Sequence, residues 1–148
     1  MSRVDFYILP EGAGTDRFAC SIAKKAWSTG NRVHIHTQSE EKAKAMDDLL
    51  WTFRDISFIP HELYNDDSIV DEDTPITIGF GKGFPAQSQV IINLDLEIPA
   101  FASKFNRIVE IVGGDENNKK FARIRYKEYK GGDYETHDHK IDKLQDYG

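Results

Sequence analysis

The chain has 148 residues, of which 39% are hydrophobic and 30% are charged, and its formal net charge is -6 at pH 7. This length and composition are typical of one folded domain with a sizeable core, and they disfavour a largely disordered chain. The acidic balance disfavours a protein that coats nucleic acid through a broad basic surface.

The first half of the chain predicts strands that alternate with helices. The strands are rich in β-branched and aromatic residues, and each helix carries an apolar stripe at helical spacing. Short helical crossovers between strands imply a parallel sheet with right-handed connections, and therefore an α/β fold. The predicted elements are a strand at 4–9, a helix from Thr15 or Asp16 to Gly30, a strand at 32–36, and a helix that Ser39 caps and that ends near Trp51.

The second half predicts further strands and ends in a polar tail. Residues 56–61 predict a short extended segment, and the acidic run at 62–73 predicts a solvated loop. Strands are expected at 75–80, 89–94 and 108–112, with a short helix that Pro99 opens and that runs through Phe105. We expect one domain at 1–132, followed by a tail at 133–148 that is partly disordered.

The last predicted helix, at 115–130, has a basic exposed face. Asp115 offers a capping oxygen at its start, and Gly131 and Gly132 permit a left-handed stop at its end. Phe121, Ala122, Arg125 and Tyr129 share an arc that packs inward, with the Arg125 stem along the edge of the core. The exposed arc carries Lys119, Lys120, Arg123, Lys127 and Lys130, with Tyr126 at its edge. On an acidic protein, this narrow basic row suits a small acidic target, and the alternative is a solvated helix face.

Other candidate sites are weaker. The glycine turn at 12–14 invites a nucleotide-binding interpretation, but it lacks the third glycine of the dinucleotide fingerprint, and Glu11 and Asp16 would repel a phosphate. The single cysteine, Cys20, lies in an apolar stripe and is interpreted as packing. The pairs His34 with His36 and His137 with His139 could each start a metal site, but the chain offers no obvious third and fourth ligand.

Several stretches together resemble the chi subunit of bacterial DNA polymerase III. The most specific are Leu50-Trp51, then Ser57-Phe58-Ile-Pro60-His61, then Ala122-Arg123-Ile-Arg125-Tyr126-Lys127, in the order and at the separations of that family. The resemblance covers about residues 3 to 130. It implies a Rossmann-like three-layer sandwich with a mainly parallel central sheet, and a non-catalytic accessory subunit of the clamp-loader assembly without a cofactor.

The resemblance also implies partners and site residues. Proteins of this family bind the acidic C-terminal tail of the single-stranded DNA-binding protein. By position, Lys119, Arg123 and Lys127 match the tail-binding cations, with Val112 and Tyr126 on the apolar side of the pocket. Phe58 and Trp51 match a second surface, where the psi subunit or a repair helicase docks in relatives, and either ring could instead belong to the core.

Two departures and two rival functions accompany the resemblance. The acidic stretch at 66–73 and the Gly113-Gly114 pair differ from the expected family pattern. The rivals are a small Rossmann-type nucleotide-binding enzyme and direct binding of nucleic acid by the basic helix, whereas the family resemblance implies mainly indirect contact with DNA. No apolar run approaches the roughly 20 residues of a membrane span, and the start of the chain lacks a signal peptide's apolar stretch, so we expect a cytoplasmic protein.

Overall fold

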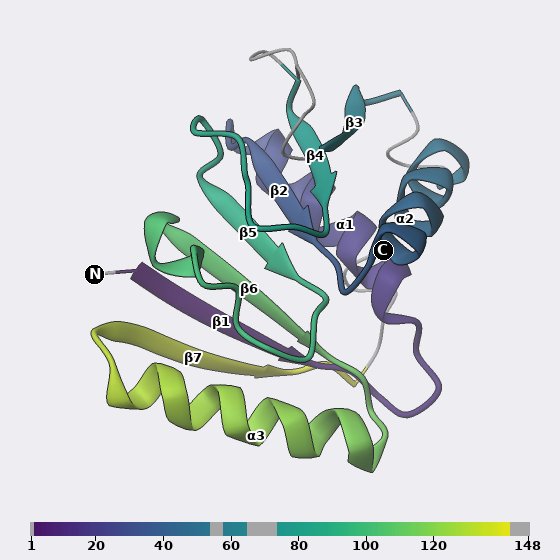
Figure 1. Cartoon of the computed structure of the whole chain (residues 1–148). Helices are drawn as coiled ribbons and strands as arrows, with labels where there is room; N and C mark the ends of the chain where they lie inside the picture. Colours follow the sequence, from purple (N-terminus) through teal and green to yellow (C-terminus); the bar gives the residue numbers. More distant parts are fainter. Residues whose placement is uncertain (1, 54–57, 65–73, 143–148) are drawn as a thin grey trace.

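The structure is a computed structural model, which describes residues 2–53, 58–64 and 74–142. Within these ranges, seven strands form one sheet in the order β3-β4-β2-β5-β6-β1-β7, and every neighbouring pair is parallel (Figure 1). The expected α/β fold with a mainly parallel sheet is confirmed. The elements are β1 Ser2–Ile8, α1 Thr15–Ser28, β2 Val33–His36, α2 Glu40–Thr52, β3 His61–Tyr64, β4 Ile76–Gly79, β5 Val90–Asn93, the 3₁₀-helix η1 Ala102–Lys104, β6 Arg107–Val112, α3 Glu116–Gly131 and β7 Tyr134–Lys140.

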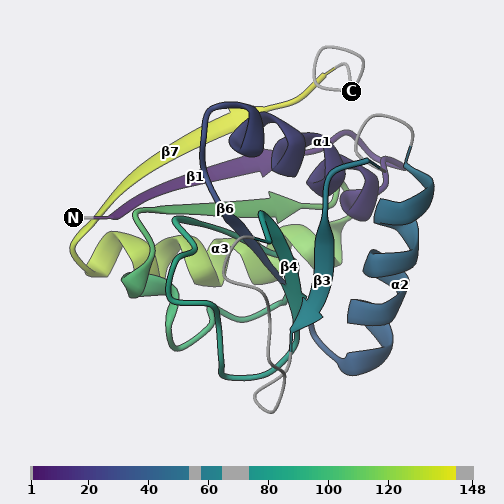
Figure 2. The ribbon, with the colours of Figure 1, turned by 90° about the horizontal axis from the view of Figure 1, so that it is seen from above.

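Helices cover both faces of the sheet. The helices α1 and α2 pack together on one face, and α3 lies along the β6, β1 and β7 side on the other (Figures 1 and 2). Alternation along a strand supplies both layers of core, because successive side chains point to opposite faces. In β6, Val109 and Ile111 join the core under α1, whereas Ile108 and Val112 join the core under α3.

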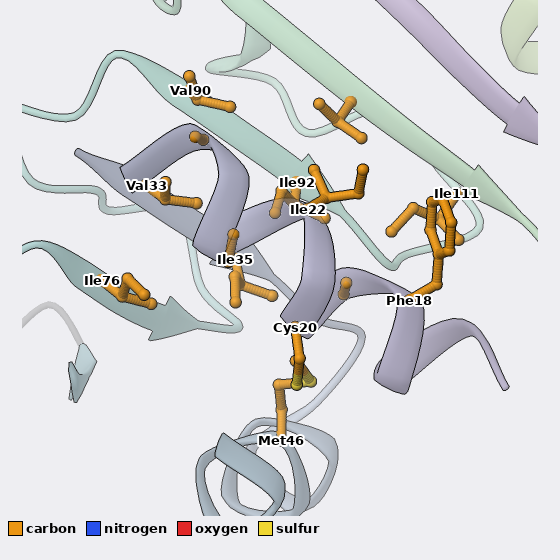
Figure 3. Close-up of a cluster of buried hydrophobic side chains, with 14 of the residues drawn as sticks. Phe18, Cys20, Ile22, Val33, Ile35, Met46, Ile76, Val90, Ile92 and Ile111 are labelled. Atoms are coloured by element: carbon orange, nitrogen blue, oxygen red, sulfur yellow. The ribbon is translucent and has the colours of Figure 1, made fainter. Parts of the chain in front are cut away.

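The larger core lies between the sheet and the first two helices. Figure 3 shows Phe18, Cys20 and Ile22 of α1 over the strands, with Cys20 directed toward Met46 of α2. Burial raises the pKa of the Cys20 thiol to about 12, so the group stays protonated and packs as a small apolar side chain. This agrees with the packing interpretation of the lone cysteine.

Local signals predicted some helix ends and missed others. Ser39 and Asp115 cap α2 and α3 as expected, each accepting a hydrogen bond from a backbone N–H three residues later. The expected cap of α1 is wrong, because Gly14 occupies that position without a side-chain bond. The expected left-handed stop of α3 is also wrong, since Gly132 has φ -106° and extended geometry. The helix predicted from Pro99 is only the single turn η1.

Two predicted polar segments contain strands. The prediction of a loop from residue 62 is wrong for Glu62, Leu63 and Tyr64, which belong to β3 and pair with β4. The prediction of a separate tail from residue 133 is wrong for β7, which pairs along its whole length with β1. Both are edge strands, which have a neighbouring strand on one side only and tolerate charged residues, so their sequences lack a hydrophobic run. The rest of the predicted loop, at 65–73, and of the tail, at 143–148, lies outside the described residues.

Candidate functional site

A groove of about 400 Å³ opens between α3 and the sheet. The first turns of α3 form one wall, the carboxyl-terminal halves of β1 and β6 form the floor, and β7 forms the other wall. Its lining residues are Phe6, Ile8, Val112, Lys119, Ala122, Arg123, Tyr126 and Asp138.

The floor of the groove is apolar. Phe6 and Ile8 alternate along β1 and therefore share the face that α3 covers, and Ile8 stands opposite Val112 in the ladder. The ring of Phe6 meets Tyr126 of α3 edge to face, with 5.5 Å between ring centroids. This surface can bury an apolar group of a ligand.

The rim on α3 is cationic. Lys119 and Arg123 are four residues apart, and so lie one above the other on the groove side of the helix. Lys119 is half-buried, whereas the Arg123 side chain is 67% exposed. The ion pair of Arg123 with Glu116, at 4.0 Å between two exposed side chains, is weak and leaves the guanidinium available. A carboxylate beside the apolar floor would meet both cations.

Four of the five predicted tail-binding residues line the groove, and the fifth does not. The structure brings Val112, Lys119, Arg123 and Tyr126 together around one groove. Lys127 is exposed on α3 and does not line the groove. Lys130, another cation of the exposed arc of α3, lies 5.5 Å from the centre of the Tyr126 ring.

A buried ionic network fixes α3 on the sheet. The Arg125 guanidinium donates to Glu110 of β6 at 2.9 Å and to the Leu96 carbonyl at 2.9 Å. Tyr129 and Asn93 also donate to the Glu110 carboxylate, at 2.7 Å and 3.0 Å. Burial raises the pKa of Glu110, and the Arg125 charge offsets part of that effect. The three side chains that hydrogen-bond this carboxylate all donate to it, and these bonds lower its pKa against the effect of burial.

Sequence reasoning missed Phe6, Ile8, Ala122 and Asp138 as lining residues. The alternation of β1 was a usable signal for Phe6 and Ile8, once α3 was assigned to one face of the sheet. The position of Asp138 depends on β7, which was not predicted. The Glu110 network was also missed, although a lone acid within the apolar run at 108–112 was a signal for a buried partner.

Trp51 and Phe58 lie with α2 and α1, the helices that cover the face of the sheet opposite α3 (Figure 1). Trp51, near the end of α2, is 57% exposed and contacts the ring of His61 at 4.2 Å between centroids. Phe58 is 69% exposed and meets Trp27 of α1 edge to face at 6.2 Å. Neither ring belongs to the core, so both are available to a partner.

The histidine pairs each have other contacts. His34 is buried and bonds Thr77 at 2.7 Å, and burial lowers its pKa to about 3. His36 lies 3.3 Å from Asp95, and burial lowers its pKa despite that carboxylate.

In β7, His137 lies 3.1 Å from Glu135 and His139 lies 2.8 Å from the buried Asp5. In the part of the chain that the structure describes, no three His, Cys, Asp or Glu side chains are grouped to hold a metal ion. The described helices include none that is long and apolar enough to cross a membrane.

Comparison with known proteins gives consistent sequence matches. The sequence profile of the family described as "DNA polymerase III chi subunit, HolC" matches residues 1–137. A Pseudomonas aeruginosa protein named DNA polymerase III subunit chi is 34% identical over 146 residues, which cover 97% of this chain and 100% of the relative. Proteins of the same name from Haemophilus influenzae and Escherichia coli are 36% identical over 83% of this chain and 29% identical over 88% of it, and the matches cover 86% and 92% of the relatives.

Solved structures of similar shape are distant in sequence. The C-terminal domain of Saccharomyces cerevisiae Dbp5, solved with Gle1 and IP6, has a TM-score of 0.64 at 11% identity, with 97% of this chain and 93% of that one covered. UvsW of T4 has a TM-score of 0.66 at 9% identity, with 94% and 41% covered. At these identities the likeness concerns the fold alone.

Proposed function

The chain belongs to the DNA polymerase III chi subunit family, and on that premise we propose that it links the polymerase assembly to single-stranded DNA-binding protein by binding the acidic C-terminal tail of that protein. A chi subunit has an accessory rather than a catalytic role in DNA polymerase III. The observation that carries the proposal is the meeting of a cationic rim with an apolar floor in one groove.

The groove suits a peptide that ends in an apolar residue and carries acids nearby. Arg123 and Lys119 supply donors for the terminal carboxylate and for an adjacent acidic side chain, and such charge-assisted bonds are stronger than neutral ones. The last side chain would enter the space bounded by Phe6, Val112 and Tyr126, where burial of its apolar surface adds affinity. Because several tails extend from one oligomeric partner, modest affinity per site suffices.

Substitution of Arg123 tests the proposal directly. We expect Arg123→Glu to weaken the binding of a labelled peptide from the cognate tail by roughly ten- to a hundredfold, since it replaces a donor to a charged group by a repelling carboxylate. Fluorescence anisotropy at two salt concentrations measures the effect, and the wild-type complex should weaken as salt rises. The unfolding transition should stay close to that of the wild type, because Arg123 is exposed.

The matched control is Lys42→Glu, which makes the same change of charge at an exposed position of α2 on the other face of the sheet. It should leave peptide affinity nearly unchanged. Equal binding by wild type and Arg123→Glu would exclude the groove as the tail site. A variant that loses both its fold and its binding would instead assign Arg123 to a structural network.

The remaining partner assignments are part of the same proposal. The exposed rings of Trp51 and Phe58 would contact psi, another clamp-loader component or a repair helicase in the cytoplasm, and contact with DNA would be mainly indirect. Two results would favour the rival functions instead. Thermal protection by ATP or a dinucleotide would favour a nucleotide-binding enzyme, and tight binding of bare oligonucleotide at physiological salt would favour direct nucleic-acid recognition.

A further inference from the structure

One groove residue has the wrong charge for an acidic ligand. Asp138 lies on β7, directly opposite Phe6 in the parallel ladder, and alternation along the strand places it on the side that α3 covers. It is exposed at the groove wall that faces Lys119 and Arg123. Among the described residues its carboxylate has no ion-pair or hydrogen-bond partner, whereas the carboxylate of Asp5 in the neighbouring strand is held by Arg3, Arg107 and His139.

An unpaired carboxylate in this place divides the groove into two walls of opposite charge. A peptide acid on the α3 wall is attracted by two cations, but an acid turned toward β7 meets a like charge a few ångströms away. Repulsion between two exposed charges at about 6 Å in water changes affinity by roughly threefold. The effect is larger where the apolar floor excludes solvent and smaller at high salt.

We propose that Asp138 is a specificity-determining residue of the groove, which confines the acidic groups of a bound peptide to the α3 wall and penalises each further acid that must face β7. The proposal rests on the proposed function, because it concerns the ligand of the same groove. It explains how a cationic site can discriminate among acidic peptides instead of binding every polyanion, since discrimination requires an unfavourable contact as well as favourable ones.

The test compares two peptides of equal length that end in the same apolar residue, one with a single acid before that residue and one with several consecutive acids. Asp138→Asn and Asp138→Thr both remove the charge, and threonine also suits a strand. The control is Asp133→Asn, which makes the same charge change at an exposed residue outside the groove lining. Anisotropy titrations at low and high salt, with unfolding curves for each variant, provide the measurements.

We expect both Asp138 variants to bind the multiply acidic peptide roughly three- to tenfold more tightly than the wild type at low salt, with a smaller gain for the singly acidic one. Asp133→Asn should change neither. If the wild type binds peptide and Arg123→Glu abolishes that binding, but both Asp138 variants match the wild type or bind more weakly, the specificity role is excluded and the proposed function stands. If the folded wild type binds neither peptide, both proposals are excluded.

Discussion

Arg123 and Arg125 lie two residues apart on α3 and have opposite environments. The side chain of Arg123 is 67% exposed at the groove rim, whereas that of Arg125 is 5% exposed and paired with the fully buried Glu110. An arginine can enter a core only where an anion and further acceptors meet it, and here β6 and the Leu96 carbonyl supply them. The sequence predicted the inward arc but placed only the Arg125 stem against the core, because its partner lies on another element.

The hydrogen-bond network around Glu110 predicts that two substitutions lower the free energy of unfolding by different amounts. Tyr129→Phe removes one donor to Glu110 and keeps the ring, so we expect a loss of about 1.5–3 kcal/mol in the free energy of unfolding. Glu110→Gln leaves Arg125 as a buried charge without a counterion, and we expect a loss of about 3–5 kcal/mol. Urea unfolding of each variant measures both.

The same two variants test whether the network acts on peptide binding only by holding α3 in position. If the network holds α3 in place over the groove, Tyr129→Phe should lower peptide affinity only slightly and in proportion to its effect on stability. Lys120→Gln, at an exposed position of α3 outside the groove lining, is the control and should be neutral for stability. A Glu110→Gln protein as stable as the wild type would show that the network does not hold the helix.

His34 gives a prediction for pH dependence. Burial lowers its pKa to about 3 in the folded protein, whereas the unfolded chain protonates it near the ordinary pKa of about 6.5. The unfolded state therefore binds more protons below that pH, and stability falls as the solution is acidified. From about pH 7 to about pH 5, we expect His34 to account for a loss of about 2 kcal/mol.

The measurement is urea unfolding of the wild type and of His34→Asn across that range of pH. The variant lacks the titrating ring, so its stability should decline less steeply, even though it starts lower because the packing with Phe105 and Tyr64 is lost. Burial also lowers the pKa of His36, so His36 adds to the loss of stability as the pH falls. The His34→Asn variant retains this contribution of His36. Parallel curves for the two proteins would mean that His34 is protonated or solvated in the folded state.

At the scale of elements, a helix or strand could be predicted where its own sequence carries a local signal. The strands β1, β2, β4, β5 and β6 and the three α-helices were predicted, because apolar periodicity and caps such as Ser39 and Asp115 are local signals. The edge strands β3 and β7 were not, because their sequences carry no hydrophobic run, and backbone bonds to a neighbouring strand hold each of them in the sheet. The α3 wall of the groove was therefore accessible from the sequence, and the β7 wall was not.

At the scale of the molecule, two separate surfaces are available to partners. The groove belongs to the α3 face, whereas Trp51 and Phe58 lie on the side of α1 and α2 with the sheet between them. Sites that share no contacts usually behave independently. We expect Trp51→Ala and Phe58→Ala to weaken binding to a clamp-loader or helicase partner at least tenfold, as loss of an aromatic hot spot does, while leaving peptide affinity unchanged.

Pull-down of the assembled partner and peptide anisotropy, measured on the same protein preparations, test this independence. Arg123→Glu serves as the reciprocal control, since it should lose the peptide and keep the second partner. Variants of the aromatic pair that lose both activities without unfolding would show that the two surfaces are coupled through the sheet.

The position of β1 limits the order in which the strands of the sheet can pair during translation. Among the described strands, β1 comes first in the sequence and lies between β6 and β7, which come last, with Arg3 opposite both Arg107 and Glu135. During translation, β1 must wait for most of the chain before either neighbour exists, and pairing across such sequence distances slows folding. The helices α1 and α2 can assemble over β2, β4 and β5 earlier, but the groove needs Phe6, α3 and Asp138 together. A nascent chain interrupted before β7 would carry the cations of α3 without the wall that faces them.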